Sequence, residues 1–500
     1  MTKKYIDIPK YTTLNEIIEK QYTLSATQYK TFSIKNKTQL TVADFLDRDL
    51  QRGDLGREVG SEHYVDNSQY LFIKTKALQQ ETFLLDENKE SLQSITRLSF
   101  SNMNLKKGDI IISKDSNVGE VAILDKDYSN AMLCGGIYKL PVTKNKYYLL
   151  AFIKSDIFRC QIDFLVPRGS TIRHGKTKFL ECKIPIPNKN REQVMKYVEL
   201  LTEAIINKEI AIKQKHKRIL EEIHKELINN QDIKNKFSYS LPNIKEIMNL
   251  DRMDSCLYSE EFKKKEFIIT NYINGTSTIY DLGFNISRGQ NLQVSNIGKS
   301  IQTDKYKEGY YKLILPKYIS KYGIVTTDSY LGNKNELKTL NIGDIIFGAD
   351  GNEKGRSLAI IEEQEMAITN IHGITLRQNG HDLTKGIFIK LFLDYLRDKG
   401  MIDSYAVGGN GGSLAIKYWN FLRFPNFDEK KEKEIVKLYH NPDVNYAISK
   451  CTLDNFLEYD IKFNEIAGIY ELDKTLKYLR KKLNNVLDNI ADDKDIKIEF

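Results

Sequence analysis

The chain alternates between two patterns of hydrophobic and polar positions. From about Leu40 to Pro187 the apolar runs are short, rich in Ile, Val and Tyr, and interrupted by Gly, Asp, Asn and Lys. Runs of this kind are typical of strands in a β-rich domain. The same pattern of short apolar runs occurs again in the second half of the chain. We expect short helices inside the two regions, at Tyr147 to Phe158 and at Gly386 to Lys399.

Each β-rich region is followed by a segment with helical periodicity. From Arg191 to Asn229 there is no Pro or Gly, and apolar residues recur at gaps of three, four or seven, which predicts one long amphipathic helix. Near the C-terminus, apolar residues from Ile469 to Ile490 alternate gaps of three and four, as in a heptad seam that needs a partner helix.

An isolated amphipathic helix usually packs on its own domain. Because two such helices follow two similar regions, we expect them to pair with each other instead. The residues expected at this pairing are Val198, Leu201, Ile205, Ile212 and Ile219 in the first helix and Leu472, Leu476, Leu479, Leu483 and Val486 in the second. The seam of the first helix is imperfect, since Lys208 and Lys215 stand at positions that a strict heptad would fill with apolar residues.

A repeated motif indicates that the chain is two copies of one unit. Leu105 to Asp115 reads LKKGDIIISKD and Leu340 to Asp350 reads LNIGDIIFGAD, with six of eleven positions identical at an offset of 235. The glycine-aspartate steps predict turns that start equivalent core strands. Other pairs follow a similar offset: Leu14-Asn15-Glu16-Ile17 with Ile244-Lys245-Glu246-Ile247, Tyr29 with Tyr258, Asp44 and Arg52-Gly53 with Asp281 and Arg288-Gly289, and Ile184-Pro185 with Phe424-Pro425.

These patterns predict an α+β protein with two β-rich domains, separated and followed by long helices. The expected boundaries are 1–190 for the first β-rich domain, 191–236 for the central helix, 237–428 for the second domain, and 429–500 for a helical junction and the C-terminal helix. The stretch from Lys437 to Asn464 has no counterpart in the first copy. We interpret it as a helical insertion that is either padding or a partner surface.

Composition narrows the class of function. Hydrophobic residues make up 41% and charged residues 28% of the 500 residues, as in ordinary globular proteins, and the net charge of +8 favours a polyanionic partner. No apolar run approaches the roughly 20 residues that span a bilayer, and the first residues lack a signal-peptide core, so we expect a cytoplasmic protein without a membrane partner. Five scattered cysteines form no CxxC pair and support neither disulfides nor a zinc ribbon.

Searches for catalytic motifs give negative results. The sequence NIGKS at Asn296 to Ser300 lacks the first glycine of a phosphate-binding loop, and the glycine-rich run from Gly408 to Ser413 lacks the following lysine. Asn441-Pro442 lacks the second proline and the aromatic residue of an amino-methyltransferase motif. The seven histidines show no metal-ligand spacing. We therefore expect no catalysis, metal or cofactor in this chain.

Basic and amide side chains do recur near turns of both β-rich domains. Arg and Lys neutralise phosphates, while Arg on guanine and Asn or Gln on adenine can read base edges in the major groove of DNA. The candidate DNA-binding residues are Arg52, Lys74, Lys76, Lys114, Arg168, Arg173 and Lys176 in the first copy and Arg288, Gln290, Asn291, Lys354 and Arg356 in the second.

The order of these features resembles the DNA-specificity (S) subunit of type I restriction-modification systems. The resemblance rests on Leu105 to Asp115, on Leu340 to Asp350, on the run from Gly169 through Lys183 to Pro187, and on the parallel run from Gly408 to Pro425. It covers nearly the whole chain, and the duplication and the helical spacers strengthen it.

The resemblance implies a non-catalytic subunit. Each β-rich domain would be a target recognition domain that reads half of a bipartite site in double-stranded DNA, and the two long helices would form an antiparallel coiled coil with pseudo-two-fold symmetry. Two modification subunits would bring S-adenosylmethionine and methylate adenine N6, and restriction subunits would join that complex in phage defence. The alternative is a recognition subunit of another defence or modification system that uses the same domains without a restriction partner.

Overall fold

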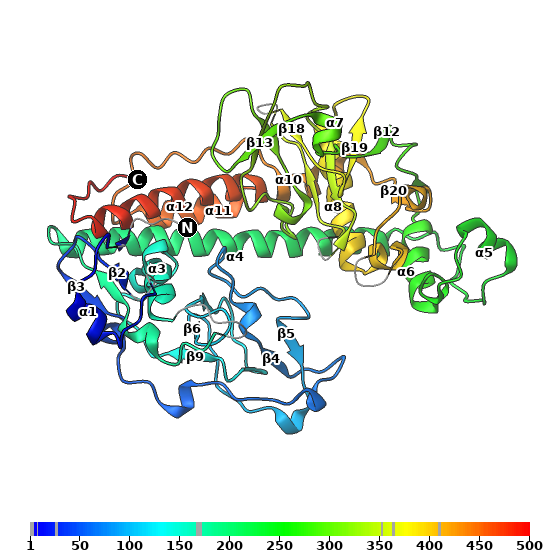
Figure 1. The fold of residues 1–500 in the computed structure, drawn as a ribbon. Coiled ribbons are helices and arrows are strands. Elements are labelled where there is room, and N and C mark those ends of the chain that lie inside the picture. The colour runs from blue at the N-terminus through cyan, green and yellow to red at the C-terminus, as the bar shows by residue number, and fades with distance from the viewer. Residues whose placement is uncertain are drawn as a thin grey trace. The chain divides into compact units, whose positions relative to one another are not determined.

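The structure is a computed structural model, and it describes residues 5–7, 9–25, 29–166, 173–351, 354–362, 366–408 and 412–500 (Figure 1). The chain combines helices and strands and divides into two compact units. The first unit contains residues 1–210, 445–465 and 474–500, and the second contains residues 211–444 and 466–473. The long helix α4 (Arg191–Asn229) contributes residues to both units.

In the residues that the structure describes, the first unit contains four small antiparallel or mixed sheets and three short helices, followed by the start of α4. Its elements up to α4 are β1 (Ile6–Asp7), α1 (Leu14–Glu19), β2 (Thr31–Phe32), β3 (Gln39–Thr41), β4 (Leu71–Ile73), β5 (Leu92–Ser94), β6 (Ile110–Ser113), β7 (Val121–Ile123), β8 (Ala131–Leu133), β9 (Ile137–Leu140), α2 (Lys146–Ile153), α3 (Asp156–Leu165) and β10 (Lys183–Pro185). Helices α11 (Phe456–Ile466) and α12 (Ile469–Ala491) add most of their residues to this unit.

The second unit has the same kind of construction. Its elements are α5 (Ile244–Leu250), α6 (Glu260–Thr270), β11 (Thr276–Ser277), β12 (Phe284–Arg288), α7 (Val294–Ile297), β13 (Ser300–Thr303), β14 (Tyr311–Leu313), β15 (Tyr330–Asn333), β16 (Ile345–Gly348), β17 (Ser357–Ala359), β18 (Ala367–Ile368), β19 (Gly373–Gln378), α8 (Leu383–Asp398), α9 (Met401–Tyr405), β20 (Phe424–Pro425) and α10 (Glu429–Tyr439).

The same strand pairings occur in both units. In the first, β4 pairs antiparallel with β5 and parallel with β8, and in the second, β14 pairs antiparallel with β15 and parallel with β18. Strand β6 lies between β7 and β9, as β16 lies between β17 and β19. The closing strands also match, because β3 pairs with β10 and β11 with β20. The second unit adds β12 and β13 at sheet edges.

The repeated sequence motif forms β6 in the first unit, between β7 and β9, and β16 in the second unit, between β17 and β19. All four residues of β6 and all four of β16 are buried. The preceding glycines, Gly108 and Gly343, have φ angles of +85° and +82°, a region that favours glycine. The carboxylates of Asp109 and Asp344 each accept a hydrogen bond from the backbone N–H three residues earlier, at 2.7 and 2.9 Å. The prediction that these steps are turns before core strands is confirmed.

The helices follow the sequence patterns with two differences. The predicted bounds of α4 agree with the structure, and the expected helix at 386–399 begins three residues earlier, where Asp382 caps it. The single helix expected at 147–158 is wrong. It is interrupted after Ile153, and α3 begins anew behind Ser155, whose hydroxyl accepts a hydrogen bond from the N–H of Phe158.

Contacts inside the first unit place α12 antiparallel to the first half of α4. Near the start of α4, Lys189 forms an ion pair with Asp495 at 2.9 Å. Farther along, Glu209 pairs with Arg480 of α12. All ten residues expected at the helix pairing are buried, with at most 6% of any of them exposed.

The insertion before α12 is only partly helical, which corrects the expectation of a helical insertion. After α10 ends at Tyr439, no helix forms until α11 begins at Phe456. Helix α11 supplies a partner for the lysine in the seam of α4. The Lys208 ammonium lies 2.8 Å from the Asp460 carboxylate, and both side chains are fully buried. The lysine that interrupts the apolar seam of α4 and the aspartate of the inserted helix α11 therefore form one ion pair.

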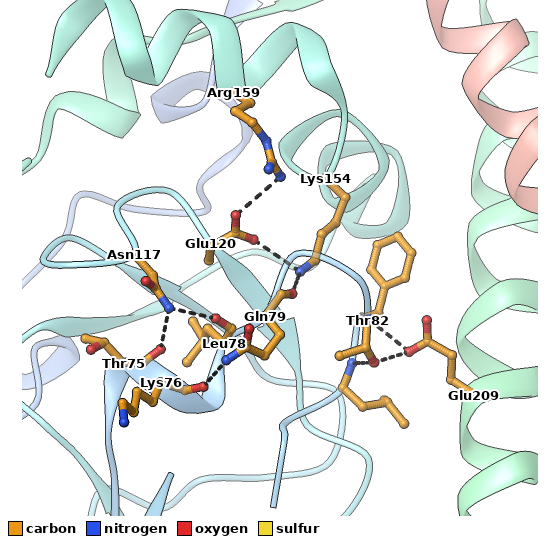
Figure 2. A network of polar contacts seen from close by, with 12 residues as sticks. Thr75, Lys76, Leu78, Gln79, Thr82, Asn117, Glu120, Lys154, Arg159 and Glu209 are labelled. Atoms are coloured by element: carbon orange, nitrogen blue, oxygen red, sulfur yellow. Dashed lines mark hydrogen bonds and ion pairs between the residues drawn. The ribbon is translucent and has the colours of Figure 1, made fainter. Parts of the chain in front are cut away.

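A polar network fastens the loop between β4 and β5 to the helices of the first unit (Figure 2). Lys154 lies 3.5 Å from Glu120 and also donates to the carbonyl of Gln79. Burial lowers the pKa of Lys154 to about 8, although Glu120 opposes this shift. Farther along the loop, the hydroxyl of Thr82 donates to Glu209 of α4 at 2.6 Å. Two charged side chains, Lys154 and Glu209, therefore hold the middle of the loop.

Candidate nucleic-acid interface

A cavity of about 200 Å³ lies at the end of β12 in the second unit. Three of the residues predicted to bind DNA, Arg288, Gln290 and Asn291, belong to its wall. The cavity is also lined by Ser287, Gly289, Lys338, Leu340, Thr369, Thr375 and Arg377. Three cationic side chains and several amide and hydroxyl groups therefore meet in one place. Such a set can contact phosphate oxygens and base edges.

The turn at this cavity depends on a close approach between two backbone segments. Gly289 donates its N–H to the carbonyl of Gly373 at 2.9 Å, and Gln290 donates to Thr369 at 2.8 Å. A Cβ atom on Gly289 would lie 2.2 Å from the carbonyl oxygen of Asn370, so only glycine fits. The turn that carries Gln290 is thereby pressed against the end of β18.

The first unit makes the same turn at Gly56, not at Gly53 as the sequence comparison predicted. Gly56 donates to Ile137 at 3.0 Å and Arg57 donates to Leu133 at 2.9 Å. A Cβ atom on Gly56 would lie 2.1 Å from the carbonyl oxygen of Cys134, whereas one on Gly53 would meet nothing within 4 Å. The structural counterpart of Gln290 is therefore Arg57, and the equivalence of Arg52-Gly53 with Arg288-Gly289 is wrong. The Arg-Gly pair common to both copies had led the sequence comparison to align Gly53 with Gly289, three residues away from the true counterpart, Gly56.

Arg288 takes part in a charged cluster at the end of the repeated motif. Its guanidinium donates to the Ser413 hydroxyl at 3.2 Å and lies 3.6 Å from the carboxylate of Asp350. His372 contacts the same carboxylate at 3.1 Å. Partial burial works to raise the pKa of Asp350, but Ser413, His372 and Arg288 together hold it below its usual value. Asp350 is therefore a charged anchor that orients the guanidinium of Arg288.

The first unit places a similar cluster at the equivalent aspartate. Asp115, the last residue of the first motif, forms ion pairs with Lys114 and with His174, the latter at 2.8 Å. A backbone bridge joins Asp115 to His174, as another joins Asp350 to Ser413. The sequence motif ends on these aspartates in both copies. Their role as the centre of a charged cluster was not foreseen from the sequence, because their histidine and hydroxyl partners lie far away along the chain.

The remaining candidates of the first unit are spread over several turns. Arg52 and Lys176 are exposed, and Lys176 adopts a left-handed backbone conformation with φ of +46°. Lys74 lies over the ring of Tyr64 at 4.6 Å, and Lys76 pairs with Glu90 on the surface. Arg168 lies outside the described residues. Their contact with DNA stays a prediction.

Three predicted DNA-binding residues have their charged groups engaged inside their own unit. Arg173 donates to the carbonyls of Val166 and Ile162 and pairs with Asp163 at 2.9 Å. In the second unit, Lys354 pairs with Asp403 of α9 at 3.1 Å, and Arg356 donates to the carbonyl of Ile319 at 3.2 Å. These contacts give all three residues a part in holding the fold.

The structure also adds residues that the sequence did not single out. Lys338 and Arg377 join Arg288 at the cavity, and the buried hydroxyl of Thr369 has no hydrogen-bond partner among the described residues. An unpaired buried hydroxyl facing a polar cavity is available to a ligand. The sequence offered one signal for Arg377, since it is the one charged residue in β19, which reads GITLRQ.

The described residues offer neither a metal-ligand cluster nor a helix that could span a membrane. No group of three or more His, Cys, Asp or Glu side chains in that part of the chain could hold a metal ion. None of the helices that the structure describes is long and apolar enough to cross a membrane.

The two units share one strand pattern, and each has cationic side chains near an equivalent turn. Residues 61–236 match the type I restriction modification DNA specificity domain family. The match extends from the strands of the first unit through the whole of α4, and it confirms the resemblance to type I specificity subunits. None of the curated proteins compared matches the sequence.

Solved structures of type I systems are also similar to this chain. The S subunit of the type I restriction-modification system from M. genitalium is 15% identical, with 92% of this chain and 96% of that chain covered and a TM-score of 0.38. The HsdS subunit from Thermoanaerobacter tengcongensis is 11% identical, with 91% and 96% covered and a TM-score of 0.26. A chain from a study of complex assembly and conformational transition of the type I R-M system is 11% identical, with 92% and 99% covered and a TM-score of 0.29.

Proposed function

We propose that this chain is the DNA-specificity subunit of a type I restriction-modification system and that it reads a bipartite site. The observation that carries the proposal is the recurrence of one strand pattern in both units, together with the specificity-domain match over residues 61–236. A duplicated reader suits a target made of two half-sites. We infer that each unit contains one target recognition domain and that the pattern arose by duplication.

The turns at Arg57 and Gln290 are the equivalent places from which each domain would enter the major groove. Gly56 and Gly289 hold these turns against a buried strand, so the side chains that follow project from a rigid support. In the second domain, Arg288, Lys338 and Arg377 would hold phosphates or guanine, while Gln290 and Asn291 suit adenine.

The long helices would hold the two readers apart as an antiparallel coiled coil. Helix α4 has 39 residues, which at a rise of about 1.5 Å each gives roughly 58 Å. Neighbouring half-sites are separated by about 34 Å for one turn of DNA, so the helix is long enough for this role.

We propose that chemistry belongs to partner subunits. Two modification subunits would bind S-adenosylmethionine, flip the target adenine out of the duplex and methylate its N6, and restriction subunits would join the assembly. The role of this chain is then to present the DNA sequence to those enzymes.

The test is to map adenine methylation by the chain assembled with its modification subunits. A bipartite methylated motif is the expected result. Arg57→Ala should relax one half of that motif, and Gln290→Ala should relax only the other half, because the two positions are structurally equivalent. A continuous motif, or methylation and cleavage by the purified chain alone, would contradict the proposal.

A further inference from the structure

Two short helices, α1 and α5, repeat the same apolar pattern near the starts of the two β-rich domains. Helix α1 lies near the start of the first unit, and α5 precedes the strands of the second. At an offset of 230 the apolar positions are Tyr11 and Leu241, Leu14 and Ile244, Ile17 and Ile247, and Ile18 and Met248. Three positions in each segment are 46% to 90% exposed, while Ile17 and Ile247 are half-buried. We call these segments, residues 11–19 and 241–250, the twin helices.

Both helices are fixed by the same capping arrangement. In α1 the hydroxyl of Thr13 accepts from the N–H of Glu16, whose carboxylate accepts from the N–H of Thr13 at 2.8 Å. In α5, Asn243 and Glu246 make the same reciprocal pair, at 2.9 and 3.0 Å. A helix of two turns is marginal in water, and capping of this kind adds about 1 kcal/mol. Both copies therefore stabilise a helix although neither buries a residue of it.

A buried tyrosine anchors each segment at its C-terminal end. The hydroxyl of Tyr29 donates to the carbonyl of Thr23 at 2.5 Å, and that of Tyr258 donates to the carbonyl of Arg252 at 2.6 Å. Each bond returns to the sixth residue before the tyrosine. The anchors hold the chain where it enters its unit and leave the apolar face of the helix outward.

In the second unit the helix borders a hollow. A cavity of about 280 Å³ is lined by Phe237, Tyr239, Pro242, Tyr258 and Phe267, and Glu246 of α5 also belongs to its wall. Aromatic side chains form much of this lining. The apolar surface at α5 is therefore larger than the helix alone.

We propose that the twin helices are docking sites for two copies of one protein, the modification subunit, one copy at each helix. This inference rests on the proposed function. Both copies share the same four apolar positions, the same cap and the same tyrosine anchor. We therefore expect the same partner to bind at both helices. Exposed apolar faces do not suit a polyanion, so DNA is not the occupant.

The size of the faces argues against a second copy of this chain. The exposed apolar side chains of one twin helix present a surface on the order of a few hundred Å², while a stable interface needs about 800 Å² from each partner. A pair of chains joined through one such face would be weak. A modification subunit could also contact other surfaces of this chain, and those contacts would supply the rest of the area that a stable interface needs.

The experiment measures how many modification subunits the full chain binds, by native mass spectrometry and titration calorimetry. Leu14→Asp with Ile18→Asp changes the first site, and Ile244→Asp with Met248→Asp changes the second. Wild type should carry two copies. Each double substitution should weaken one of the two binding events by about tenfold or more, and combining all four should weaken both.

Matched controls place aspartate at exposed apolar residues outside the twin helices. Leu98 is 93% exposed and Ile301 is 61% exposed, and Leu98→Asp and Ile301→Asp should leave two copies bound at unchanged affinity. Circular dichroism and the fluorescence of Trp419 verify that every variant is folded.

Three results would overturn the inference. If wild type binds two copies and the twin-helix variants bind two copies equally well, the docking sites are elsewhere while the proposed function stands. If the chain alone is a dimer that the variants separate, the occupant is a second copy of this chain. If wild type binds no modification subunit at all, the proposed function and this inference both fail.

Discussion

The buried ion pair between α4 and α11 allows a quantitative test of the packing in the first unit. Lys208 and Asp460 are 0% exposed, and their charged atoms are 2.8 Å apart. Asn464 also accepts from the ammonium at 2.8 Å, and the rings of Tyr446 and Phe463 lie 4.3 and 4.7 Å away. Burial lowers the pKa of Lys208, while Asp460 opposes that shift. The substitution to make is Lys208→Met, which keeps much of the volume and removes the charge.

Removing the ammonium leaves the Asp460 carboxylate buried without a counter-charge. Breaking a buried pair in this way costs about 3–5 kcal/mol. Tyr446 donates to Asp460 at 2.6 Å and Asn464 donates at 3.0 Å, so some stabilisation of the carboxylate persists. We therefore expect the lower end, about 3 kcal/mol, or a fall in melting temperature of about 10 °C for a unit of this size.

Calorimetry and circular dichroism should show the loss in the transition of the first unit. Trp419, the only tryptophan, lies in the second unit, and its fluorescence transition serves as an internal control. The double variant Lys208→Met with Asp460→Asn should recover most of the stability, because the isolated charge is gone and the hydrogen-bonding shape is kept.

The comparison between Lys208→Met and wild type is made at a single pH, so that the two proteins differ only in the lost counter-charge. Equal stability of Lys208→Met and wild type at pH 8 would refute the reasoning.

Three further predictions concern other sites. Gly56→Ala should destabilise the first unit by about 1–3 kcal/mol or more in calorimetry because of the clash at the Cys134 carbonyl, whereas Gly53→Ala should change little, and equal effects would rule out the close approach. Burial lowers the pKa of His216 although Asp394 opposes it; stability of the second unit should therefore fall as the pH drops through about 6.5, and His216→Gln should flatten this slope in urea titrations followed by Trp419. Arg288→Ala should weaken cognate DNA binding and reduce the salt slope of the assembled complex by about one, and an unchanged affinity and slope would remove Arg288 from the interface.

The sequence predicted the elements that depend on local patterns. The bounds of α4 followed from the absence of Pro and Gly and from the apolar spacing, and the turns at Gly108 and Gly343 followed from the repeated motif. The break between α2 and α3 was missed because apolar residues continue on both sides of Ser155. Local pattern carries no record of a cap that competes with helix continuation.

Contacts between distant segments could not be predicted in the same way. The equivalence of Arg57 and Gln290 depends on which carbonyl each preceding glycine touches, and that glycine is the only residue of the pair that the two copies share. Likewise, Lys208 and Asp460 are 252 residues apart, and nothing near either residue names the other. The path of the chain through the fold determines which distant residues meet. In a single sequence, only the internal repeat gave information about that path.

The polar residues in the seam of α4 explain how an otherwise apolar stripe can hold a defined register. Apolar side chains alone would tolerate a shift by one heptad, because the pattern repeats. In the first unit, Lys208 is satisfied only opposite Asp460, and Glu209 only opposite Thr82 and Arg480. A slip by one heptad would bury each of these charges without its partner, at a cost of several kcal/mol. The apolar stripe of α4 therefore gives up some hydrophobic stability for a single alignment of the helix with its domain, which is the property that the proposed spacer helix would need.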